Sequence, residues 1–156
     1  MKDISALLKS AQGKKTAILT AGNDMRADDG AGPLIIRTLS GKTKASLFDG
    51  GELPENLAFK IIQLNPEMLF IIDAANMDKE PGHIAVINEK DISGPSFSSH
   101  RMPLSMLTGF ITKELPGIKV IIIGIQPQGT ELGKPMSAAV RNAVNKLSGL
   151  FTENEI

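Results

Sequence analysis

Two aspartates and one histidine supply side chains from which a metal-binding or proton-transferring site could be built. They are Asp29, Asp73 and His100, which lie far apart in the sequence. Two carboxylates and one imidazole make a two-oxygen, one-nitrogen set. Such a set suits a divalent transition metal with open coordination positions, such as nickel, iron, manganese or zinc. A carboxylate could also serve as a general base. Only a fold that brings the three segments together would make them a site.

Each of these residues also has an ordinary structural explanation. Asp28 and Asp29 come just before a predicted helix, where an acidic residue is expected as the N-cap. Asp73 ends an apolar run, where a polar residue commonly marks a turn. His100 lies in a polar stretch and His83 starts a short predicted strand, so both fit ordinary surface histidines. Residue type and spacing alone therefore leave the metal site open.

The segments that would position these side chains alternate between strands and helices. Short apolar runs predict strands, and apolar residues at helical spacing predict helices. Strands are predicted at residues 16–21, 45–49, 68–73, 84–87 and 119–125, and helices at 4–12, 32–39, 56–64, 103–115 and 136–150.

This order of segments predicts an α/β fold with a five-stranded, mostly parallel sheet. Helices between successive strands favour parallel pairing, with the sheet covered on both sides. The strand at 84–87 follows the strand at 68–73 without a helix between them. It is therefore expected at an edge of the sheet, antiparallel to its neighbour. In such folds ligands bind outside the carboxyl ends of the strands, where Asp29 and Asp73 are expected.

Composition narrows the class of protein. The chain has 156 residues, enough for one domain. Residues 1–156 are therefore interpreted as a single domain, with an N-terminal helix in 1–13 and the motifs between 16 and 150. Lys+Arg and Asp+Glu are 17 each, so the formal net charge is zero, which disfavours nucleic-acid binding. The sequence has no secretory signal and no apolar run of membrane-spanning length. We therefore expect a cytoplasmic protein with no membrane contact.

Several common catalytic arrangements are missing from the sequence. There is no H-E-x-x-H helix, no G-x-S-x-G turn and no P-loop. The absence of cysteine excludes disulfide bonds and a cysteine nucleophile. Ser98 and Ser99 have no recognisable activating partner. The segment Gly30-Ala31-Gly32-Pro33 departs from the dinucleotide-binding pattern G-x-G-x-x-G. These absences leave the two aspartates and the histidine as the strongest candidates.

Several short motifs follow one another in order between about residue 16 and residue 150. They are Gly22-Asn23, Asp28-Asp29-Gly30-Ala31-Gly32-Pro33, Asp49-Gly50-Gly51, Pro54-Glu55-Asn56, Ile71-Ile72-Asp73-Ala74-Ala75, Pro81-Gly82, His100-Arg101-Met102-Pro103-Leu104 and Gly124-Ile125-Gln126-Pro127. Together these motifs resemble those of the hydrogenase maturation endopeptidases, and the nearest subgroup is the one that processes formate-hydrogenlyase-type hydrogenase. One departure is Thr20, which stands where many members have the first glycine of Gly-x-Gly-Asn.

The resemblance implies a fold, an activity and a site. The fold is a three-layer αβα sandwich around a five-stranded mixed sheet. The activity is removal of the C-terminal extension of the nickel–iron hydrogenase large-subunit precursor after nickel insertion, by an endopeptidase that the family naming classes as aspartic-type. The family's catalytic and metal-contacting residues fall on Asp29, Asp73 and His100. The metal is nickel already bound by the substrate, which acts as the recognition mark, and the enzyme is expected to be a monomer.

Three other functions remain open from the sequence alone. A maturation chaperone on the same fold would bind nickel or the precursor without cutting it. A phosphoester hydrolase would hold Mg²⁺ or Mn²⁺ between Asp29 and Asp73. A flavodoxin-like nucleotide binder is disfavoured, because the glycine fingerprint is missing and aromatic residues make up only 4% of the chain.

Overall fold

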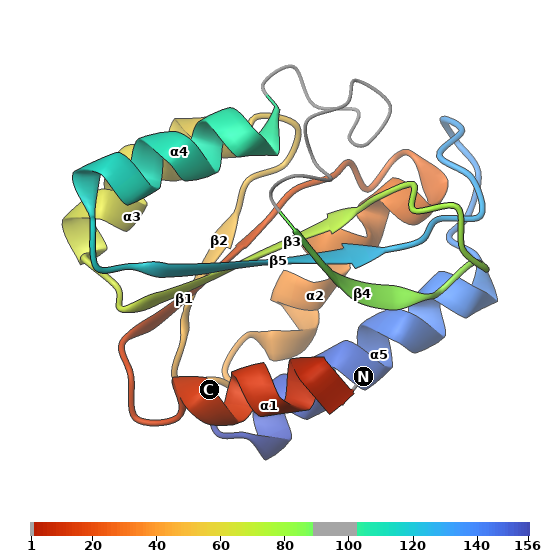
Figure 1. Cartoon of the computed structure of the whole chain (residues 1–156). Coiled ribbons are helices and arrows are strands. Elements are labelled where there is room, and N and C mark those ends of the chain that lie inside the picture. The colour runs from red at the N-terminus through yellow and green to blue at the C-terminus, as the bar shows by residue number, and fades with distance from the viewer. Residues whose placement is uncertain (1, 89–102) are drawn as a thin grey trace.

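The computed structural model describes residues 2–88 and 103–156, and within them five strands form one mixed sheet (Figure 1). The strands are β1 (Thr16–Thr20), β2 (Ser46–Asp49), β3 (Met68–Ala74), β4 (Ile84–Ile87) and β5 (Lys119–Ile125). The helices are α1 (Lys2–Ala11), α2 (Ala31–Leu39), α3 (Ala58–Leu64), α4 (Leu104–Glu114) and α5 (Ala138–Glu153). Two short 3₁₀ turns, η1 (Ala27–Gly30) and η2 (Pro54–Leu57), lead directly into α2 and α3.

The strand order is β2-β1-β3-β5-β4. The first four strands in this order are parallel, and β4 pairs antiparallel with β5 at the edge. The predicted α/β class, the mostly parallel sheet and the antiparallel edge strand are all confirmed. The two 3₁₀ turns were not predicted, and the last helix runs from Ala138 to Glu153, not from 136 to 150.

Helices cover both faces of the sheet, which gives the three layers seen in Figure 1. One face carries α1, α2 and α5, and its core includes the edge-to-face pair Phe70 and Phe151, with ring centroids 5.2 Å apart. The other face carries α3 and α4, whose residues Ile61 and Leu107 pack against the sheet. Because side chains alternate along a strand, neighbouring residues of β3 enter different layers.

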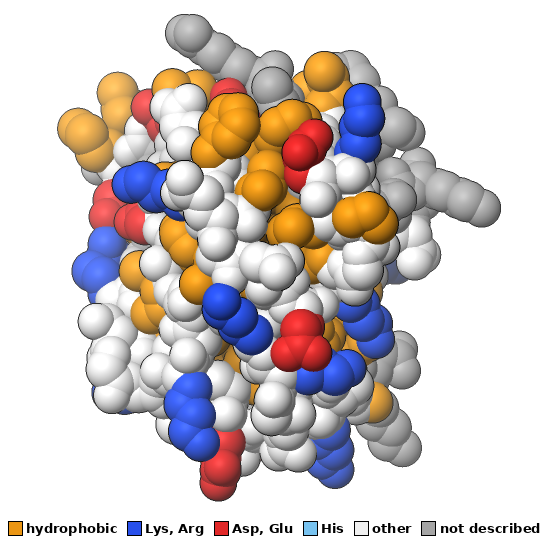
Figure 2. Space-filling model, turned by 90° about the vertical axis from the view of Figure 1, so that its left-hand side faces the viewer, with side chains coloured by type: hydrophobic (Ala, Val, Ile, Leu, Met, Phe, Trp, Pro, Cys, Tyr) orange, Lys and Arg blue, Asp and Glu red, His pale blue; other side chains and the backbone are white. Residues whose placement is uncertain are grey.

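The outer surface of α3 and α4 exposes large hydrophobic side chains. Phe59 is 70% exposed and packs edge-to-face on Phe110, with ring centroids 5.8 Å apart. Figure 2 shows hydrophobic side chains in the upper part of this side of the molecule and lysine or arginine side chains mainly below them. No helix among the described residues is both long and apolar enough to cross a membrane.

Candidate functional site

Asp29 lies in η1, the 3₁₀ turn that follows the loop after β1. Its side chain is buried, with 4% of the residue exposed. The backbone N–H of Asn23 donates a hydrogen bond of 2.9 Å to Oδ2 of Asp29. The N–H of Asp29 donates to the carbonyl oxygen of Arg26 at 2.9 Å. These bonds hold the carboxylate at the carboxyl edge of the sheet, where the sequence predicted it.

Two glycines, Gly22 in the loop after β1 and Gly32 in α2, allow the backbone around Asp29 to pack tightly. Gly22 has a φ of +131°, and a Cβ there would lie 1.9 Å from the carbonyl oxygen of Asp29. A Cβ on Gly32 would lie 2.2 Å from the carbonyl oxygen of Ala21. Side chains at either position would push η1 or α2 away from β1. Close backbone packing therefore explains why glycine stands at these two positions of the family-like motif.

Asp73 is the second-last residue of β3 and is 2% exposed. It alternates with Leu69 and Ile71, so it points to the sheet face covered by α3 and α4. Its partner in the register of β5 is Gly124, which has no side chain to compete for this space. The Cα atoms of η1 and β3 approach within 8 Å of each other. The structure therefore brings together the two elements that carry Asp29 and Asp73.

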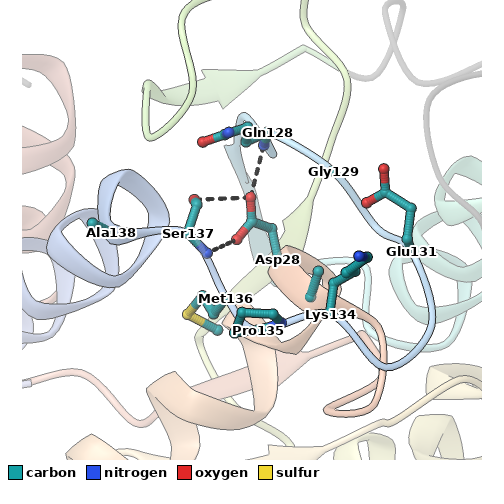
Figure 3. A pocket seen from close by; sticks show the side chains of 10 residues that line it. Asp28, Gln128, Gly129, Glu131, Lys134, Pro135, Met136, Ser137 and Ala138 are labelled. Atoms are coloured by element: carbon teal, nitrogen blue, oxygen red, sulfur yellow. Dashed lines mark hydrogen bonds between the residues drawn. The ribbon is translucent and has the colours of Figure 1, made fainter.

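Asp28 does not have the capping role that the sequence predicted, and neither does Asp29. The N-cap of α2 is Gly30, and no side chain caps that helix. The carboxylate of Asp28 instead accepts hydrogen bonds from the N–H of Gln128 at 2.7 Å, the N–H of Ser137 at 2.7 Å and the Oγ–H of Ser137 at 2.9 Å (Figure 3). The N-cap prediction is wrong because both acids lie within η1, whose last residue, Gly30, is the N-cap of α2, and because a segment distant in sequence supplies the donors to Asp28.

A cavity of about 500 Å³ opens beside Asp28. Its wall comes mostly from the loop after β5, including Gln128, Glu131 and Lys134 (Figure 3). Sequence reasoning missed this loop as part of the site region. The one sequence feature that pointed to this loop was the motif that contains Gln126. That motif does not indicate which segment of the chain the loop contacts.

The structure describes one of the two histidines. His100 lies outside the described residues, so its placement stays a prediction. His83 is exposed and lies directly before β4, as expected for a surface histidine. Within residues 2–88 and 103–156, no three histidine or acidic side chains form a group that could hold a metal ion. The described residues therefore contribute the two carboxylates of the predicted set.

Thr20, the departure from the family pattern, remains the last residue of β1 and is fully buried. Its carbonyl oxygen accepts from the N–H of Gly50 at 2.8 Å, and the next loop closes through the N–H of Gly22 and the carbonyl oxygen of Gly51 at 2.9 Å. Its hydroxyl has no hydrogen-bond partner among the described residues. The chain after β1 thus turns at Gly22, and Thr20, two residues earlier, fits in place of the glycine that many family members have there.

An exposed ion pair fastens the outer side of the same loop to α2. Asp24 accepts two hydrogen bonds from the guanidinium of Arg37, at 2.6 and 3.1 Å. The hydrogen bond to Asp24 raises the pKa of Arg37 above its ordinary value, more than burial lowers it. Both side chains are about half exposed, at 55% and 50%, so the pair adds little to stability.

Comparison with known proteins identifies the family. The model of the HycI family, described as hydrogenase maturation protease, matches residues 34–154, which is more than half of the chain. The chain belongs to this family. The matched residues include Asp73 and His100, whereas Asp29 precedes them. The resemblance noted in the sequence is confirmed, and it makes the chain a member of a protease family.

Individual relatives agree with this assignment. The hydrogenase 3 maturation protease of Escherichia coli K12 is 36% identical over 130 residues, which are 81% of this chain and 82% of that protein. The crystal structure of a [NiFe] hydrogenase maturation protease HycI from Thermococcus kodakarensis matches with a TM-score of 0.86 and 27% identity, over 96% and 97% of the two chains. The solution structure of the endopeptidase HycI from E. coli matches with a TM-score of 0.80 and 34% identity, over 89% and 90%.

Proposed function

We propose that this protein is an endopeptidase that removes the C-terminal extension of a nickel–iron hydrogenase large-subunit precursor after nickel has been inserted. The observation that carries the proposal is the pair of buried carboxylates at the carboxyl edge of the sheet. Asp29 lies on η1 and Asp73 on the end of β3, and these two elements are in contact. A hydrogenase maturation protease would use this edge for its substrate, as α/β sheets commonly do.

In this proposal Asp29, Asp73 and His100 contact the nickel of the substrate. Two carboxylates and an imidazole suit a divalent transition metal that already has thiolate ligands and open positions. Holding the metal would hold the nearby scissile peptide. Positioning of this kind can contribute up to about 7–11 kcal/mol of barrier lowering in the best case. One of the two carboxylates would then act as the base that activates water for attack on the peptide carbonyl.

The proposal is tested by mixing the purified protein with precursor that has or lacks nickel and weighing the products by mass spectrometry. Loss of the C-terminal tail from the nickel-loaded precursor alone is the expected result. An intact precursor that co-purifies with the protein would favour the non-cleaving chaperone. Hydrolysis of small phosphoesters with Mg²⁺ or Mn²⁺, without cleavage of the precursor, would favour the phosphoester hydrolase.

A matched pair of variants tests the role of Asp73. Asp73→Asn removes one negative charge from the buried edge and is expected to abolish cleavage while the protein stays folded. Asp78→Asn makes the same chemical change five residues further on, where the side chain is exposed and φ is +53°, a conformation that asparagine tolerates. This control should cleave at the wild-type rate. Equal rates for both variants would rule out a catalytic or metal-contacting role for Asp73.

A further inference from the structure

The segment from Gln126 to Ser137 carries none of the three predicted site residues, yet it is bonded to both carboxylate-bearing regions. It leaves the end of β5 and enters α5. At its start, Gln126 binds the chain that follows β3. Gln128, two residues further on, and Ser137 at the end of the segment both donate hydrogen bonds to Asp28, the neighbour of Asp29. We call residues 126–137 the brace.

On the Asp29 side, the brace holds a buried carboxylate. Asp28 is 1% exposed, and its three donors come from two residues of the brace. Ser137 is also the N-cap of α5, because its Oγ accepts from the N–H of Val140 at 3.2 Å. The hydroxyl of Ser137 therefore links Asp28 directly to the first turn of a helix of 16 residues.

Three further hydrogen bonds fasten the loop before Asp29 to the brace. The N–H of Asp28 donates to the carbonyl oxygen of Gly129 at 3.1 Å. The guanidinium of Arg26 donates to the carbonyl oxygen of Thr130 at 3.2 Å. The N–H of Gly133 donates to the carbonyl oxygen of Met25 at 2.8 Å. The end of the loop between β1 and η1 is thus attached to the brace at Met25 and Arg26, not only at Asp28.

On the Asp73 side, the brace acts through Gln126, which is 7% exposed. Its Oε1 accepts from the N–H of Met77 at 2.6 Å and from the N–H of Lys79 at 3.3 Å. Its Nε2 donates to Oδ1 of Asn76 at 3.2 Å. The chain directly after Asp73 is therefore held by the same segment that holds Asp28.

We propose that Asp28 is a positioning residue, which acts through the brace to fix Asp29 relative to Asp73. Asp28 touches no reacting atom in this proposal. Its carboxylate sets the place of η1 against α5, and η1 carries Asp29 with its bond to Asn23. Gln126 fixes the other carboxylate-bearing segment to the same brace. The expected effect on cleavage rests on the proposed function, whereas the effect on the position of Asp29 does not.

The test uses Asp28→Asn, which keeps the size of the side chain. Asparagine replaces one accepting oxygen with an NH₂ group, which would meet an N–H of Gln128 or Ser137, donor against donor. We expect kcat for precursor cleavage to fall about 10–100-fold, which is typical when a residue that orients a metal-contacting side chain is replaced. KM should rise as well, because the displaced Asp29 is itself a proposed contact to the nickel of the substrate. Ser137→Ala, which removes one of the three donors, should lower kcat in the same direction by less.

A second readout does not depend on cleavage. The backbone N–H of Asn23 donates to Asp29, so its amide proton signal in a ¹H–¹⁵N spectrum reports the position of that carboxylate. The signal should move in Asp28→Asn and, by less, in Ser137→Ala. The control is Val144→Ala, which loosens the buried face of α5 without touching Asp28. It should leave both kcat and the Asn23 signal as in the wild type.

The possible results separate this proposal from the proposed function. If the wild type cleaves and Asp28→Asn retains its kcat, the positioning role is refuted. If Val144→Ala lowers kcat as much as Asp28→Asn, the effect is a loss of stability and the positioning role is also refuted. If the wild type does not cleave any precursor, the proposed function fails, and the Asn23 signal alone decides whether Asp28 positions Asp29.

Discussion

Gly22→Ala, which adds a single methyl group, should lower the free energy of unfolding of this protein strongly. Gly22 has a φ of +131°, outside the left-handed well that other residues occasionally adopt. Backbone strain of this kind costs about 1–3 kcal/mol. The new Cβ would also lie 1.9 Å from the carbonyl oxygen of Asp29, an atom of the backbone that cannot rotate away. Overpacking adds about 1–3 kcal/mol. The total is about 4 kcal/mol, a large part of the ~5–15 kcal/mol that holds a domain of this kind folded.

The assay is urea unfolding followed by circular dichroism. With a slope of about 2 kcal/mol/M, a loss of about 4 kcal/mol lowers the midpoint by about 2 M. Gly13→Ala is the matched control, because Gly13 has a φ of +74° and nothing lies within 4 Å of the position of its Cβ. It should lose only the strain of a left-handed alanine, about 1–2 kcal/mol. Equal midpoints for the two variants would refute the argument that close approach to Asp29 is what requires glycine at position 22.

Three further variants test the packing and the hydrogen bonds described above. Phe151→Ala removes a fully buried ring that packs on Phe70 and should lower the free energy of unfolding by about 3–5 kcal/mol in the same urea assay. Gln126→Ala removes the acceptor of the N–H groups of Met77 and Lys79, neither of which is buried, and should cost about 0.5–1.5 kcal/mol, with faster hydrogen exchange at these two amides. Arg37→Ala breaks the exposed pair with Asp24 and should cost under about 1 kcal/mol, less at high salt. An arginine is charged at every ordinary assay pH, and Asp24 raises the pKa of Arg37 further, so titration of Arg37 should not change this small cost.

Much of the fold could be predicted from the sequence because the signals are local. β1, β3 and the last five residues of β5 are buried on both faces of the sheet, and such strands are continuous hydrophobic segments in the sequence. The edge position of β4 followed from the missing helix before it. The 3₁₀ turns were not predictable, since nothing in Ala27–Gly30 distinguishes a short turn from the first turn of α2.

The candidate site could be predicted less well, because its determinants are distant in sequence. Asp29 and Asp73 were grouped by residue type, and only the contact between η1 and β3 supports their proximity. Asp28 was assigned to a cap by a local rule, although its partners lie about a hundred residues further along the chain. Local propensity contains no information about which loop will arrive at a buried carboxylate. The role of His100 rests on the family-like motif and stays a prediction.

The bond between Asp28 and Ser137 also has a consequence for when the protein can act during its own synthesis. The two residues are 109 positions apart in the chain. At about 5–20 residues per second, a ribosome needs about 5–20 s to make the intervening segment. Until the first turn of α5 has left the ribosome, η1 lacks the partner that fixes Asp29. A nascent chain whose α5 has not yet docked should therefore hold Asp29 less firmly, and full activity is expected only after α5 has packed against η1.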